Sequence, residues 1–478
     1  MAMFFYCGIV TIINHIGDEP MVKLITKQFV RYWKIWLSVL PVFLASGLVF
    51  STSFTILNEM RGVNSVDIDD YSVFMQMPII TGAVMLLLLT TNTMKQCIDF
   101  FDDTNDILLL LGGSPVQLSF LMTGQMLLVG IIGTFIGSLF SIPAAQAFFS
   151  VLPSYSARQT FSHLTLHLSW NVTFITLLLQ ISIITITCMR YCLKNFKKRK
   201  GILSSYDASI KTRLNGKFFG ILALIISVGG TVYLYFKNVP DPAVVKEYTR
   251  SMNNSMNILL LLWLSLLVGM NFLVRPIFRA IVNRIVDLPK ISKHPMVRIA
   301  FYNMQYNVEG LVKLIRPVSI ITLLLGNFIA LFLNTRLLID GANSGSYISD
   351  LILSLEFLFG APIIISLANI FASTCLFRMK TRVESKNYFH TGCTPNWIFK
   401  TRMIEISTIS IISILTTLIG MVLFAIPLLR VTYLGGGNIF KANWSVNILL
   451  SLGTFLLFSL GFIVIYWFER HSLKKYVE

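Results

Sequence analysis

Long apolar stretches without charged residues alternate with short polar or basic segments along nearly the whole chain. A helix needs about 20 apolar residues to cross the roughly 30 Å hydrocarbon core of a bilayer. Ten stretches reach or approach this length. They cover residues 35–58, 71–94, 118–142, 170–189, 218–236, 256–274, 317–335, 357–377, 406–429 and 442–468. The pattern predicts an all-α polytopic membrane protein with ten transmembrane helices.

Composition and charge support this prediction and orient the helices. Of the 478 residues, 55% are hydrophobic and 13% are charged, whereas soluble domains have about 25% charged residues. The formal net charge is +17, from 39 Lys and Arg against 22 Asp and Glu. With the N-terminus inside, 31 of these basic residues lie in cytoplasmic segments and eight lie outside, as the positive-inside rule requires. We therefore expect cytoplasmic termini, and we attribute the charge to the anionic bilayer leaflet rather than to nucleic acid.

The first residues of the chain do not fit a transmembrane helix. Residues 1–13 are apolar but too short to span a bilayer, and they lack the basic start and cleavage site of a signal peptide. From Met21 the sequence is basic and amphipathic up to the first span. We expect that Met21 is the natural start or that residues 1–20 are poorly ordered; a short interfacial anchor is the alternative.

Two similar turns indicate an internal repeat. Leu111-Gly-Gly-Ser-Pro-Val-Gln117 precedes span three, and Thr391-Gly-Cys-Thr-Pro-Asn-Trp397 precedes span nine, 280 residues later. The same shift aligns Gln125 with Glu405. We therefore predict two four-span repeats with a two-helix insertion between them, arranged about a pseudo-twofold axis along the membrane normal. The alternative is that these are two ordinary turns whose similarity arises by chance.

The repeat predicts how the chain is divided. The expected segments are a leader with a cytoplasmic amphipathic helix (1–34), the first four-span repeat (35–189), a basic cytoplasmic linker (190–217), the inserted hairpin (218–274), a cytoplasmic linker with an amphipathic helix (275–316), the second four-span repeat (317–468) and a cytoplasmic tail (469–478).

Each turn is expected to form a rigid elbow between two helices. Glycine ends a helix in a left-handed conformation, and Ser or Thr followed by Pro begins the next. We call residues 102–117 the first elbow and residues 384–397 the second elbow. The residues predicted to couple these elbows to a partner are Asp106, Gly112, Gly113, Ser114, Pro115, Gly392, Cys393, Thr394, Pro395 and Glu405.

The chain carries little of the chemistry that an enzyme or an ion-coupled carrier requires. It has no phosphate-binding P-loop, and we expect no catalytic residues, no metal site and no cofactor of its own. His163 and His167 lie four residues apart, but the alternating segment around them favours an extended or interfacial strand over a helical metal site. Neutral or isolated polar residues remain as candidates for contact with a substrate. They are Glu356, Asn327, Gln125 and Gln180.

At the two elbows the sequence resembles the FtsX-like permeases of ATP-binding cassette (ABC) transporters, the mechanotransmission type. That family has a cytoplasmic run ending in Gly-x-Ser/Thr between its second and third spans, often with a Glu early in the third. Glu405 matches this pattern, whereas Gln125 departs from it. The ten-span layout resembles the bacitracin-export-type permeases. Between spans seven and eight only about residues 336–350 are available for an extracellular domain, so the large one usual there is absent.

The resemblance implies a permease subunit in a bacterial cell membrane. Two copies of a separate cytoplasmic ATPase, which bind the ATP and Mg²⁺, would dock at the elbows. A sensor histidine kinase is a further implied partner. The implied activity is export, or removal from the outer leaflet, of an amphipathic or antimicrobial peptide or another hydrophobic compound. The alternatives are an ion-coupled secondary carrier and a non-transporting signalling partner of an ATPase and a sensor kinase.

Overall fold

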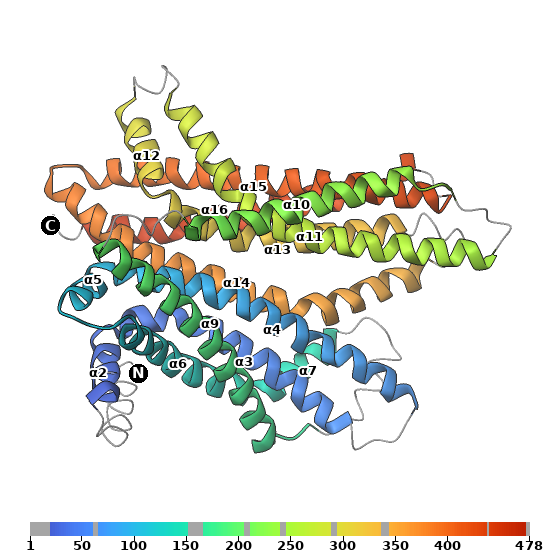
Figure 1. The fold of residues 1–478 in the computed structure, drawn as a ribbon, viewed down its shortest axis with the longest axis horizontal. Helices are drawn as coiled ribbons and strands as arrows, with labels where there is room; N and C mark the ends of the chain where they lie inside the picture. Colours follow the sequence, from blue (N-terminus) through green and yellow to red (C-terminus); the bar gives the residue numbers. More distant parts are fainter. Residues whose placement is uncertain are drawn as a thin grey trace. The chain divides into compact units, whose positions relative to one another are not determined.

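The computed structural model describes residues 20–60, 66–151, 166–204, 211–239, 245–287, 294–335, 344–436 and 439–474. Within this part of the chain every regular element is a helix (Figure 1), as the sequence predicts. Two compact units can be separated, unit 1 from residues 1–209 and 348–379, and unit 2 from residues 210–347 and 380–478. Residues 1–19 lie outside the described part, so the expectation for the leader is not addressed.

Seven of the described helices belong wholly to unit 1. They are α2 (Pro20–Arg31), α3 (Trp33–Met60), α4 (Val66–Phe100), α5 (Asp102–Leu110), α6 (Pro115–Leu139), α7 (Ser141–Val151) and α9 (Trp170–Ser204). Unit 2 contains α10 (Lys211–Phe236), α11 (Val245–Val286), α12 (Pro295–Tyr306), α13 (Val308–Thr335), α15 (Pro395–Leu434), the 3-10 helix η3 (Ile439–Lys441) and α16 (Ser445–Lys474). The long helix α14 (Ser344–His390) contributes residues 348–379 to unit 1 and its remaining residues to unit 2.

Eight of the described helices contain a stretch long and apolar enough to cross a membrane. These stretches lie in α3, α4, α6, α9, α11, α13, α14 and α15. Two shorter apolar stretches, Gly220–Phe236 of α10 and Asn447–Ile463 of α16, fall at the fifth and tenth predicted spans. The length and apolar composition of these helices therefore identify a multi-pass membrane protein.

Unit 1 is held together by close packing of α3 against α6. Gly133 and Gly137 lie one turn apart on α6 and face α3: a Cβ at Gly137 would approach the Leu44 carbonyl oxygen to 2.5 Å. Small residues at such spacing let two membrane helices approach closely, where packing replaces the hydrophobic effect. The Gln180 amide of α9 also reaches α3, where it donates to Ser46 Oγ at 2.8 Å. Three helices of unit 1, α3, α6 and α9, thus share one core.

Residues 348–379 of α14 join unit 1 through polar contacts with α4. Thr93 Oγ1 donates to Asn369 Oδ1 at 2.7 Å, and Gln96 Nε2 donates to Ser373 Oγ at 3.0 Å. The two contacts advance together along both helices, so α4 and α14 run parallel here. The two units do not coincide with the two predicted repeats, because part of the predicted second repeat, residues 348–379, belongs to unit 1. The boundaries of the repeats stay a prediction.

The hairpin of α10 and α11 is tied to α15 in unit 2. The Arg430 guanidinium of α15 donates to the carbonyl oxygens of Leu234, Tyr235 and Lys237 at 2.9–3.2 Å. The last carbonyls of a helix have no partner within it, so Arg430 satisfies the end of α10. Lys237 Nζ in turn donates to Ser255 Oγ of α11 at 2.8 Å, and partial burial lowers the pKa of this ammonium group.

Candidate functional site

The first elbow has a defined backbone geometry. Gly112 adopts a φ of +95°, which only glycine adopts readily. Its N–H donates to the Leu109 carbonyl at 3.2 Å, and the Gly113 N–H donates to the Leu108 carbonyl at 2.9 Å. Ser114 then caps α6, because its side chain accepts from the Gln117 N–H while the Gln117 side chain accepts from the Ser114 N–H. Residues 111–114 therefore form a turn of defined conformation between α5 and α6.

The second elbow repeats this geometry 280 residues later. Gly392 has a φ of +92°, and its N–H donates to the Phe389 carbonyl at 3.0 Å. The Cys393 N–H donates to the Tyr388 carbonyl at 3.0 Å. Thr394 caps α15 with the same ψ of 148° that Ser114 has. The turn chemistry expected at both elbows is therefore present.

Each elbow lies near a short amphipathic helix that precedes a long span. These helices, α2 and α12, are both 12 residues long, and both begin Pro-Met-Val followed by a basic residue. Each makes one amide contact with the helix after its elbow. Gln125 Nε2 of α6 donates to Gln28 Oε1 at 3.1 Å, and Asn303 Nδ2 of α12 donates to Glu405 Oε1 of α15 at 3.0 Å. Figure 1 shows α2, α5 and the start of α6 at one end of unit 1.

Unit 2 adds a buried ion pair at this contact. Arg402 Nη1 donates to Glu405 Oε2 at 2.7 Å, and both side chains are only 4–5% exposed. Arg402 Nη2 donates to Glu384 Oε2 of α14 at 2.8 Å, and this carboxylate is 40% exposed. Charge-assisted bonds of this length are about twice as strong as neutral hydrogen bonds. A single guanidinium therefore joins the helix before the second elbow to the helix after it.

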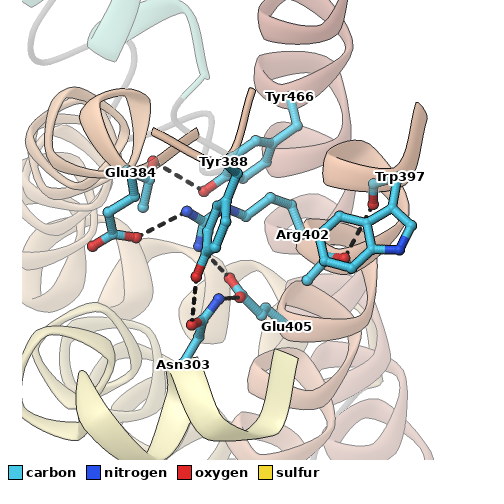
Figure 2. Close-up of polar contacts among 9 residues, drawn as sticks. Asn303, Glu384, Tyr388, Trp397, Arg402, Glu405 and Tyr466 are labelled. Carbon is cyan, nitrogen blue, oxygen red and sulfur yellow. Dashed lines mark hydrogen bonds and ion pairs between the residues drawn. The ribbon is translucent and has the colours of Figure 1, made fainter. Parts of the chain in front are cut away.

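The ion pair continues into a network that reaches four helices (Figure 2). Tyr388 Oη of α14 donates to Asn303 Oδ1 at 2.9 Å, and the Tyr388 ring lies 6.4 Å from the Trp397 ring, edge to face. The hydroxyls of Thr381 on α14 and Tyr466 on α16 lie 3.4 Å apart. We call the set Asn303, Glu384, Tyr388, Arg402 and Glu405 the charged cluster. It fixes the second elbow to α12 and α15.

The first elbow is held by a weaker contact. Arg199 Nη1 of α9 donates to Asp106 Oδ1 of α5 at 2.8 Å, with side-chain exposures of 22% and 47%. Exposed ion pairs contribute about 0–1 kcal/mol, because water screens both charges. The helix before this elbow is also interrupted at Phe101, whereas α14 continues without a break to His390. The two elbows therefore have the same backbone conformation, but the side-chain contacts that hold the second elbow are stronger.

The cap at the first elbow leads to a testable prediction. We expect Ser114→Ala to destabilise the start of α6 by about 1 kcal/mol, because one N–H of the first turn loses its acceptor. The local opening rate, measured by amide hydrogen exchange at residues 116–118, should rise. The variant Ser182→Ala removes a hydroxyl that is exposed and bonded only within its own helix, and it should leave that rate unchanged. Equal exchange in Ser114→Ala and wild type would contradict the prediction.

The polar residues predicted to face a substrate occupy different environments. Gln125 and Gln180 are buried and donate to neighbouring helices. Asn327 of α13 is 1% exposed, and neither of its side-chain amide atoms has a partner within the described residues. The Glu356 side chain lies outside the described part of the structure. The contact of these four residues with a substrate stays a prediction.

Sequence reasoning did not single out Asn303, Tyr388 or Arg402. A signal was present for the first of them, since Pro20-Met-Val-Lys and Pro295-Met-Val-Arg recur 275 residues apart. Aligning these two segments pairs Gln28 with Asn303. No comparable signal identifies Arg402, because Met122 occupies its position in the first half.

Comparison with known proteins assigns no family to the chain. No protein-family model matches the chain, and a search of curated proteins finds no match either. Its interpretation therefore depends on the elbows, the charged cluster and the membrane helices.

Proposed function

We propose that the chain is the membrane-spanning permease subunit of a bacterial ABC transporter, with its ATPase activity in a separate chain. The observation that carries this proposal is the pair of elbows. Gly112 and Gly392 share one backbone conformation, and each elbow is followed by a capped membrane helix. Such an elbow is a compact projection that a cytoplasmic partner can push or pull as a rigid body.

The proposed topology has ten spans, with both termini in the cytoplasm and two four-span repeats. Equal helix lengths support the repeat: α3 and α13 each have 28 residues and an internal proline, Pro41 and Pro317. The apolar stretches of α10 and α16 supply the two spans beyond the eight longer ones. Two copies of the ATPase dock at the elbows, and their ATP-driven closure moves the two repeats against each other.

The proposed substrate is an amphipathic or antimicrobial peptide or another hydrophobic compound. It is exported or removed from the outer leaflet. This choice follows the resemblance to bacitracin-export-type permeases, which also suggests a sensor histidine kinase as a further partner. The short segments between the predicted spans leave the helices themselves as the main contact surface for such a compound.

Co-purification tests the proposal. The full chain, solubilised in detergent with ATP and Mg²⁺ present, is expected to retain the ATPase encoded beside it, and the mass of the complex should correspond to one permease with two ATPases. ATP hydrolysis by the complex should exceed that of the ATPase alone. A purified chain that retains no ATPase and alters no ATPase rate would refute the proposal and favour an ion-coupled carrier.

A further inference from the structure

The two elbows present opposite surfaces at matching exposed positions. In the first elbow Leu110 is 72% exposed and Leu111 is 78% exposed, and Ile107 and Val116 are also more than half exposed. A shift of 280 residues places a polar residue at each of these four positions. These residues are Asn387, His390, Thr391 and Asn396, and all four are exposed. The first elbow is therefore apolar where the second is polar.

The fold does not require the apolar surface of the first elbow. Both elbows have the same glycine conformation, the same hydrogen bonds across the turn and the same type of cap. The second elbow makes this structure with polar residues at the exposed positions. Large apolar side chains gathered on a surface mark a site of interaction when the fold gives no other reason for them.

The surroundings of the first elbow indicate a protein partner rather than lipid. The apolar part of α9 ends at Arg190, and Arg199 lies nine residues further along the same helix, about 13 Å at the helical rise. Arg199 pairs with Asp106 of α5. The first elbow is therefore held beyond the point where α9 leaves the hydrocarbon, and its leucines meet water or protein.

The two elbows differ in charge as well as in polarity. Residues 102–117 contain three aspartates and no lysine or arginine. Residues 384–397 contain one base, Lys386, and one acid, Glu384, which Arg402 already engages. A partner surface that suits the first elbow, an apolar groove with a basic rim, does not suit the second. Electrostatic complementarity of this kind sets partner choice.

We propose that the first elbow is the tight anchor of the cytoplasmic ATPase and that the second elbow binds an identical ATPase copy more weakly. This inference rests on the proposed function. Two identical copies present the same groove, so they meet one matched and one mismatched elbow. Without nucleotide, the complex holds one ATPase firmly at residues 107–116. The second copy is retained chiefly through ATP-dependent contact with the first.

The test measures binding of the purified ATPase to the full-length permease in nanodiscs without nucleotide. Wild type should show two classes of site whose Kd values differ at least about tenfold, or about 1.4 kcal/mol. The double variant Leu110→Asn/Leu111→Thr, which gives the first elbow polar residues like those of the second, should lose the tight class. Tyr306→Ser, at a side chain that is 95% exposed but outside both elbows, should keep it.

A second variant leaves the first elbow unchanged, so its result does not depend on whether the Leu110→Asn/Leu111→Thr variant disturbs the fold there. His390→Leu/Thr391→Leu places leucines at the matching positions of the second elbow and should convert the weak class into a tighter one. A single class of equal sites, or equal loss of binding from changes at either elbow, would overturn the inference while leaving the proposed function intact. No binding by wild type would overturn both.

Discussion

Replacing Arg402 with methionine should cost about 3–5 kcal/mol of folding free energy, the range for breaking a buried ion pair. The change leaves Glu405, itself almost fully buried, without its cationic partner. It also releases Glu384 of α14, so the second elbow loses its strongest link to α15. The expected result is a clear fall in the denaturant midpoint of the detergent-solubilised chain.

A double variant that gives α15 the neutral residues found at the matching positions of α6 tests whether the unpaired charge causes this loss of stability. Met122 and Gln125 occupy the positions that correspond to Arg402 and Glu405, and Gln125 already makes a neutral contact with Gln28. The double variant Arg402→Met/Glu405→Gln should therefore recover to within about 1 kcal/mol of wild type, because removing both charges leaves no buried ion. A double variant as unstable as Arg402→Met alone would show that the loss of packing around Arg402, and not the unpaired charge, causes the effect.

Valine at both elbow glycines should abolish stimulation of the partner ATPase while leaving the chain inserted in the membrane. A Cβ at Gly112 or Gly392 would meet no atom within 4 Å, so the expected effect comes from the backbone conformation. A β-branched residue at φ values of +95° and +92° strains the turn by about 1–3 kcal/mol. The turn is expected to relax by changing its conformation, which redirects the helix before it.

Gly436 supplies a matched control for this experiment. It also has a positive φ, +79°, and a Cβ there would meet no atom within 4 Å, but it follows α15 at the opposite end from the elbow. Gly436→Val imposes similar strain and should leave ATPase stimulation near the wild-type value. Wild-type stimulation by Gly112→Val/Gly392→Val, with normal membrane insertion, would contradict the role assigned to the elbows.

Much of the helical architecture could be predicted from local sequence. Apolar length predicted membrane helices at 35–58 and 118–142; α3 covers the first segment, and α6 covers the second only as far as Leu139, where the helix ends before α7 begins. Turn residues predicted the elbows because glycine conformation and Ser or Thr capping depend on only a few neighbouring residues. The same local rules did not establish the number of spans, since the apolar stretches of α10 and α16 are shorter than the other eight.

The charged cluster could not be predicted in this way. Asn303 and Glu405 are separated by 102 residues, and only packing of α12 against α15 brings them together. Arg402 was counted among the cytoplasmic basic residues, although its side chain is 4% exposed and lies between two carboxylates. A basic residue beside a span looks the same in sequence whether it faces lipid headgroups or a neighbouring helix.

By itself, the sequence determined that this is an all-helical membrane protein with two capped elbows in matching positions. Those features follow from apolar length and from turn residues, which act locally. The tertiary structure alone decided that residues 348–379 join unit 1 and that the second elbow is supported by a buried charged cluster. It also decided which elbow residues remain exposed. These properties depend on which helices pack together, and packing is set by side chains that lie far apart in the chain.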